Sequence, residues 1–125
     1  YFVDLELANI HLVILQDIDE AYRYGKKEYE KRPQNIDVCK TMAKIHYKKN
    51  NLDEANKLID IASRTNKQDA EIFCLKGLIN FKLGEEIKGI ALMDSALKID
   101  PFLDEDLQQE KRAVSKNEIS ALYQD

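Results

Sequence analysis

The chain has 125 residues, the length of one domain and enough to bury a core if its helices stack. Its 19 basic and 23 acidic residues leave a net charge of −4 and form no clustered basic stripe of the kind that nucleic-acid binders carry. No uninterrupted apolar run approaches the roughly 18 residues of a membrane span. We therefore expect no nucleic-acid partner and no membrane span. Few glycines and prolines in a chain rich in Leu, Ile, Ala, Lys and Glu indicate an all-α protein.

The first predicted helix, about residues 2–15, is apolar nearly all round. A helix of this kind is normally buried on more than one side. The terminal helix of a stack, however, should have a polar face exposed to solvent. Because the chain opens on Tyr1 and not on methionine, we expect a fragment of a longer protein, whose preceding part would cover this helix. The alternative is a homodimer formed through the same helix.

The second predicted helix begins after Asp17 and ends near Lys31. Acidic residues in its first turn and basic residues in its last turn suit the helix dipole. A turn at residues 32–35 follows, and Asn50-Asn51 makes the next hairpin turn. The following helices are predicted over about 36–49, 52–65 and 70–82.

Residues 83–101 show the clearest pattern in the chain. Leu83-Gly84 is a turn, and the apolar residues after it, among them Ile90, Met93 and Leu97, recur at three- and four-residue steps, which predicts an amphipathic helix that ends near Ile99. It ends there because the residue before Pro101 resists the helical conformation. In the tail, 104–125, we expect a helix over about 103–114 that caps this one.

Small residues recur at a spacing of 34 positions. Ala96 lies 34 residues after Ala62, and Gly89 lies 34 residues after Ala55. This period divides the chain into three blocks of equal length, 2–35, 36–69 and 70–103.

The third block carries signature residues, namely Gly77, Phe81, Gly84, Ala96 and the final Leu97-Lys98-Ile99-Asp100-Pro101. Together with the period, these residues resemble the tetratricopeptide repeat, a helix-turn-helix unit. The resemblance covers residues 2–103 and implies a right-handed superhelix, or α-solenoid, of three hairpins. Two pairs of residues depart from the family pattern. Gly25 and Glu28 stand where a bulky and a small apolar residue are usual, and His46 and Asn80 stand where tyrosine is usual.

The sequence offers no constellation for chemistry. His11 and His46 stand alone, and His46 is interpreted as a partly buried substitute for tyrosine. Cys39 and Cys74 are interpreted as small buried hydrophobes, since a disulfide between packed helices would need favourable geometry. We expect no catalytic residues, no metal site and no cofactor. For the compartment we expect the cytoplasm, with the bacterial periplasm as the alternative.

The resemblance implies that the first helix of each block lines a concave wall and that one face of it points into a groove. That face would carry a basic and aromatic centre between apolar flanks, which suits a protein or peptide partner with hydrophobic anchors and an acidic residue opposite Lys40 and Lys44. Glu6 and Glu71 argue against a clamp for a terminal carboxylate. The alternative is a homo-oligomerisation element that associates through the apolar first helix and binds no partner in the groove. The predicted partner-binding residues are Ile10, Val13, Lys40, Lys44, Tyr47, Leu78 and Phe81.

Overall fold

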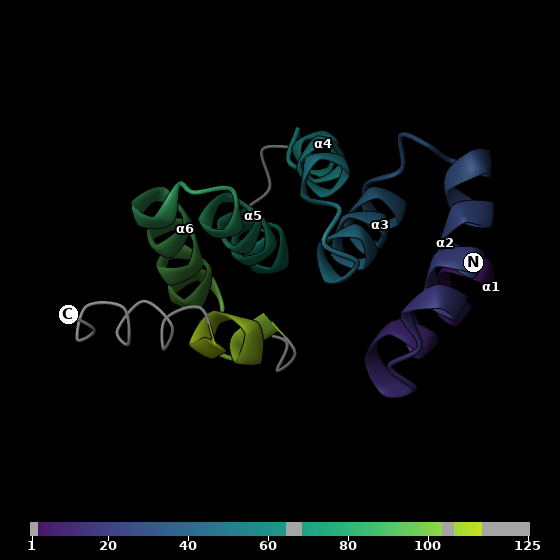
Figure 1. Cartoon of the computed structure of the whole chain (residues 1–125), viewed down its shortest axis with the longest axis horizontal. Coiled ribbons are helices and arrows are strands. Elements are labelled where there is room, and N and C mark those ends of the chain that lie inside the picture. The colour runs from purple at the N-terminus through teal and green to yellow at the C-terminus, as the bar shows by residue number, and fades with distance from the viewer. Residues whose placement is uncertain (1–2, 65–68, 104–106, 114–125) are drawn as a thin grey trace. The chain divides into compact units, whose positions relative to one another are not determined.

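The structure, a computed structural model, describes residues 3–64, 69–103 and 107–113 (Figure 1). Helices joined by short turns make up these ranges, and no strand occurs within them. The all-α prediction is confirmed. The chain forms two compact units, Tyr1–Lys67 and Gln68–Asp125.

The first unit consists of two helical hairpins. α1 packs against α2, α3 packs against α4, and contacts between α2 and α3 join the two pairs. The Asp17 carboxylate caps α2 by accepting from the Glu20 N–H at 3.2 Å. Asn35 caps α3 in the same way through the Val38 N–H at 3.1 Å. The elements are α1 (Val3–Asn9), the π-helical turn η1 (Ile10–Ile14), α2 (Ile18–Lys31), α3 (Ile36–Lys48) and α4 (Leu52–Ala62).

The prediction of one continuous α-helix over residues 2–15 is wrong beyond Asn9. Residues 10–14 form a π-helical turn in which the Leu15 N–H donates to the Ile10 carbonyl at 3.0 Å. Gln16, with a φ of 52°, ends the helix. A π turn holds one more residue than an α turn, so Leu15 leaves the face that α-helical spacing would share with Ala8 and Leu12. Periodicity gave no warning, because this segment is apolar at nearly every position.

Two departures from the family pattern find an explanation in the core of the first unit. A Cβ on Gly25 would lie 2.7 Å from the Met42 sulfur and 3.1 Å from Cδ1 of Ile45, so the glycine makes room for α3. Glu28 is buried, and its carboxylate accepts from the Arg32 guanidinium at 2.7 Å. A buried carboxylate needs such a partner, since taking an unpaired charge out of water is costly.

The second unit contains a third hairpin, formed by α5 (Ala70–Lys82) and α6 (Glu86–Ile99). Both helices end where the sequence predicted. Gly84, with a φ of 101°, supplies the turn between them. A Cβ on Gly77 would lie 2.5 Å from the Gly89 carbonyl oxygen, so the two backbones meet directly where the helices cross.

Residues 107–113 are helical and lie on this hairpin. The Leu107 carbonyl is 4.0 Å from the Cys74 sulfur on α5, and the Lys111 ammonium is 3.5 Å from the Asp94 carboxylate on α6. The predicted C-terminal helix therefore starts later than expected, because Leu103 is not helical. Residues 104–106 and 114–125 lie outside the described residues, as does Thr65, the predicted end of the fourth helix. The division into three repeats and a capping helix stays a prediction.

Both cysteines are buried thiols. The Cys39 thiol donates to the Pro33 carbonyl at 3.3 Å, and burial raises its pKa. Cys74 lies in the other unit, beneath residues 107–113. The prediction that both residues pack as small hydrophobes is confirmed.

Candidate functional site

Five of the seven predicted partner-binding residues lie on the first helices of the first unit. A hydrogen bond of 3.3 Å from the Thr41 hydroxyl to the Asn9 side chain joins these helices. The aliphatic pair on η1 is exposed to solvent, whereas the α3 residues lie deeper. Lys40 is half-buried, and Lys44 and Tyr47 are only 8 % and 2 % exposed. The five residues are Ile10 and Val13 on η1 and Lys40, Lys44 and Tyr47 on α3.

The other two predicted residues, Leu78 and Phe81, lie on α5 in the second unit. Leu78 is fully buried and Phe81 is half-buried. A single groove through all seven residues stays a prediction.

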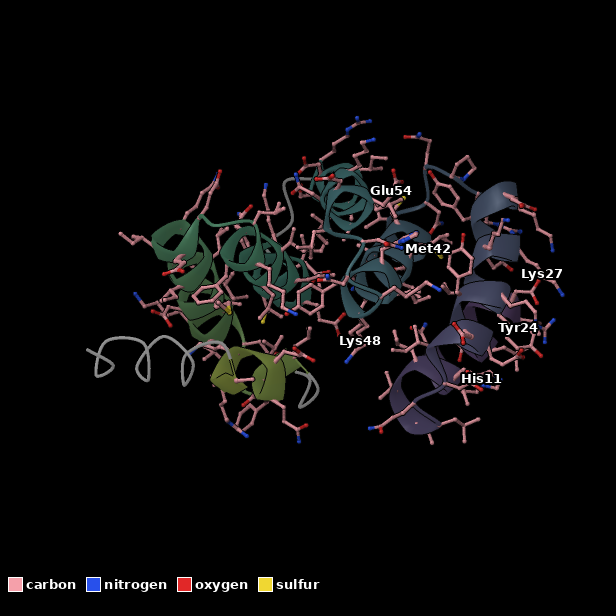
Figure 2. All side chains as sticks on the ribbon, in the orientation of Figure 1. His11, Tyr24, Lys27, Met42, Lys48 and Glu54 are labelled. Carbon is pink, nitrogen blue, oxygen red and sulfur yellow. The ribbon has the colours of Figure 1, made fainter. Side chains whose placement is uncertain are left out.

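The exposed aliphatic surface of η1 is larger than the sequence indicated. Ile14 is 72 % exposed and Leu15 is 58 % exposed, and both adjoin Ile10 and Val13. We call these four residues the η1 patch. On α3, Lys48 continues the row of Lys40 and Lys44 at the same four-residue step, and Figure 2 labels it at the end of that helix. Neither extension was predicted from the sequence.

A second cluster, also not predicted, surrounds Tyr24 on α2. The His11 ring of η1 stacks on the Tyr24 ring, with centroids 5.3 Å apart and planes 16° apart. The Arg23 guanidinium lies 4.4 Å from the centroid of the same ring, and the Lys27 ammonium lies 5.6 Å from it. Figure 2 shows His11, Tyr24 and Lys27 following one another along one side of the first hairpin.

Glu20 holds one edge of the Arg23 guanidinium. The guanidinium donates to the two Glu20 carboxylate oxygens at 2.7 to 3.3 Å, and this hydrogen bonding lowers the pKa of Glu20 and raises the pKa of Arg23. The i, i+4 spacing of aromatic and basic residues along α2 could have indicated this face, but the stacking partner His11 comes from another element. A shallow surface pocket here is lined by Tyr22, Arg23, Lys26, Lys27 and Glu30.

His46 on α3 packs against the same helix from the other side. Its ring meets the Tyr22 ring edge-on at 5.6 Å, and its Nδ1 is 3.3 Å from the Asn51 side-chain nitrogen. Burial lowers the pKa of His46, and the nearby Lys49 adds to this effect while Glu54 opposes it. The tyrosine-like packing expected of His46 is present, with a side chain that can gain a proton in acid.

The position of His46 predicts a loss of stability in mild acid. Because its folded-state pKa lies below the ordinary value of 6.5, the unfolded chain binds more protons on this residue. The contribution of neutral His46 to stability is therefore complete at pH values above the ordinary histidine pKa. It is lost as the pH falls from that pKa toward the folded-state pKa. We expect the thermal midpoint to fall between about pH 7.5 and 5.5, and to fall less in His46→Tyr. Equal pH dependence of both proteins, followed by circular dichroism, would contradict this role.

These observations define a class of protein first. Helical hairpins that follow one another along the chain, with apolar and basic side chains displayed on their outer faces, are the architecture of a helical-repeat protein. Among the described residues, no group of three or more His, Cys, Asp or Glu side chains could hold a metal ion. No helix in the same ranges is long and apolar enough to cross a membrane.

The sequence model of the tetratricopeptide repeat matches residues 12–79, more than half of the chain, and the chain belongs to this family. The match begins within η1, includes α2, α3 and α4 whole, and ends within α5. No curated protein sequence gives a significant match. Tetratricopeptide repeats generally mediate protein–protein interaction, and the family is generally a non-catalytic scaffold.

Proposed function

We propose that this chain is an interaction scaffold that binds a peptide segment of a partner protein on the first helices of its hairpins. The observation that carries this proposal is the η1 patch, a group of exposed aliphatic side chains that directly follows α1, and a hydrogen bond joins α1 to the lysine-bearing helix α3. Adjoining exposed aliphatic residues of this kind commonly mark a protein contact. The family membership supports the same conclusion.

The chemistry of the surface specifies the kind of segment. Covering a half-exposed aliphatic side chain contributes about 1 kcal/mol, so the η1 patch supplies most of the affinity. The positive charge of Lys40, Lys44 and Lys48 favours acidic residues in the ligand and contributes more to specificity and association rate than to affinity. Leu78 and Phe81 would extend the apolar contact in the second unit. The expected ligand has hydrophobic anchors beside acidic residues.

The proposal is tested by selecting peptides on the intact chain from a displayed library and measuring their affinity for variants. Ile14→Asp and Lys40→Glu should each weaken a selected peptide, Ile14→Asp by at least about tenfold, which is 1.4 kcal/mol. Ile87→Asp and Lys98→Glu are the matched controls, because both residues are exposed on α6. Circular dichroism shows whether each variant is folded. If the η1 and α3 variants bind as well as the controls, the first helices are not the binding surface.

Homo-oligomerisation is the second candidate, and the same exposed aliphatic residues favour it, since a second copy would cover them equally well. Light scattering across a concentration series separates the two candidates. A dimer that dissociates in Ile14→Asp but not in Ile87→Asp would support self-association. A monomer at every concentration would leave peptide binding as the function of the patch.

A further inference from the structure

We infer that the outer face of α2 is a second docking surface, distinct from the first helices, and that it takes an extended acidic peptide segment. The surface, called the α2 face, consists of three cations in a row and two tyrosines beside them. Its residues are Tyr22, Arg23, Tyr24, Lys27 and Lys31, with Lys26 at the edge of the shallow pocket.

The charges along this row are not balanced within the protein. Arg23, Lys27 and Lys31 stand at successive four-residue steps, and like charges at this spacing destabilise a helix. Arg23 pairs with Glu20, and Lys31 lies 3.6 Å from the Asp4 carboxylate. In the described part of the chain, no carboxylate lies within ion-pair distance of Lys27 or of its neighbour Lys26. The middle of the row therefore has no direct ion pair, and an external anion would relieve the repulsion between its cations.

The tyrosine ring prepares two of the cations for binding. Arg23 and Lys27 lie over Tyr24, and His11 supports that ring from η1. A cation held over an aromatic ring has lost part of its conformational freedom before the ligand arrives, which lowers the entropic cost of binding. Tyrosine and arginine are also the residues that most often dominate binding energy at protein interfaces. The π-helical turn thus has a role at this face, because it carries the supporting histidine.

The spacing of the row specifies the conformation of the ligand. Four residues of α-helix rise about 6 Å, and alternate residues of an extended chain are about 6.6 Å apart. A peptide that runs along α2 with acidic side chains at alternate positions would place one carboxylate near each of the three cations. This register requires only a short acidic segment.

A peptide fits this face better than a nucleic acid does. Asp19, Glu20 and Glu30 lie on the same helix as the basic row, and the chain carries a net charge of −4. A polyphosphate backbone, which needs neutralisation along its whole length, would be repelled by these carboxylates. A peptide can place its carboxylates on the row and neutral side chains elsewhere.

The test uses the intact chain and a fluorescein-labelled peptide of alternating glutamate and threonine. A second peptide has glutamine in place of every glutamate. We expect fluorescence anisotropy at low salt to show binding of the first peptide with a Kd below about 1 mM and no binding of the second. Lys27→Glu should weaken binding at least about tenfold, and Lys27→Arg should restore it. Lys98→Glu on α6 is the matched control, because it changes the net charge equally and should leave the affinity unchanged.

Three outcomes would overturn the inference. The first is absence of binding to the wild-type chain, and the second is equal weakening by Lys27→Glu and Lys98→Glu, which would indicate non-specific attraction. The third is tighter binding of an oligouridine of the same length, lost in Lys27→Glu, which would make the occupant a nucleic acid. Ile14→Asp should leave binding of the acidic peptide unchanged. Failure at the α2 face can therefore be told apart from failure of the proposed function on the first helices.

Discussion

Replacing Gly77 by alanine is expected to unfold the second unit at temperatures at which the wild-type chain is still folded. The new Cβ would lie 2.5 Å from the Gly89 carbonyl oxygen and 3.0 Å from the Met93 backbone nitrogen. No side-chain rotation can relieve a contact with backbone, so α5 and α6 would have to separate. Overpacking of this kind costs about 3 kcal/mol, and the better helix propensity of alanine returns about 1 kcal/mol. The net loss of about 2 kcal/mol is large for a unit of this size.

The measurement is urea unfolding followed by circular dichroism, with other glycine variants as controls. Gly89→Ala should behave like Gly77→Ala, because its Cβ would lie 2.5 Å from the Gly77 carbonyl oxygen. Gly84→Ala meets no atom but keeps a φ of 101°, which costs about 1 kcal/mol. Gly25→Ala comes closest to the flexible ends of the Met42 and Ile45 side chains, which can shift, and should cost less than Gly77→Ala. If Gly77→Ala were as stable as Gly25→Ala, the direct backbone contact between α5 and α6 would be wrong.

Replacing Arg32 by methionine is expected to destabilise the first unit by about 2 kcal/mol. Glu28, whose side chain is 4 % exposed, would lose the guanidinium that now lies 2.7 Å from its carboxylate. Removing one partner of a fully buried pair costs about 3–5 kcal/mol, and the 40 % exposure of the Arg32 side chain reduces that figure.

A double-mutant cycle separates the charge from the packing of the arginine stem. In a Glu28→Leu background, which restores the apolar character usual for the family, Arg32→Met should cost less than about 0.5 kcal/mol, as at an ordinary surface position. Glu28→Leu alone should be neutral or stabilising, since apolar residues often replace buried ion pairs without loss. An equal cost of Arg32→Met in both backgrounds, measured by urea unfolding, would show that lost packing and not an unpaired carboxylate is responsible.

The helices of the second unit could be predicted closely because their boundaries are local. Gly84 and Pro101 act through their own backbone, and the small residues at a period of 34 reflect close helix contacts that the structure contains. The π-helical turn could not be predicted in this way. In the sequence, a π turn would appear as a break in the spacing of apolar and polar residues. Residues 10–15 are almost all apolar, so no such break is visible.

The candidate sites were less accessible to sequence reasoning than the fold. Helical spacing put Lys40 and Lys44 on one face, but their burial depends on tertiary neighbours that spacing does not specify. The cluster around Tyr24 was missed because it depends on contact with His11, a residue of another helical segment. Side chains that act together across elements become visible only when the elements are in place.

The η1 turn also bears on how such a surface can change over evolutionary time. A π turn holds one more residue than an α-helical turn, so deleting one exposed residue of this turn would leave a regular α-helix in which the residues after it keep the directions they have now. The helix would survive and its inner side chains would keep their positions, while the exposed aliphatic group would shrink. A change of one codon in gene length is therefore enough to add or remove one exposed aliphatic side chain without a compensating change in the core.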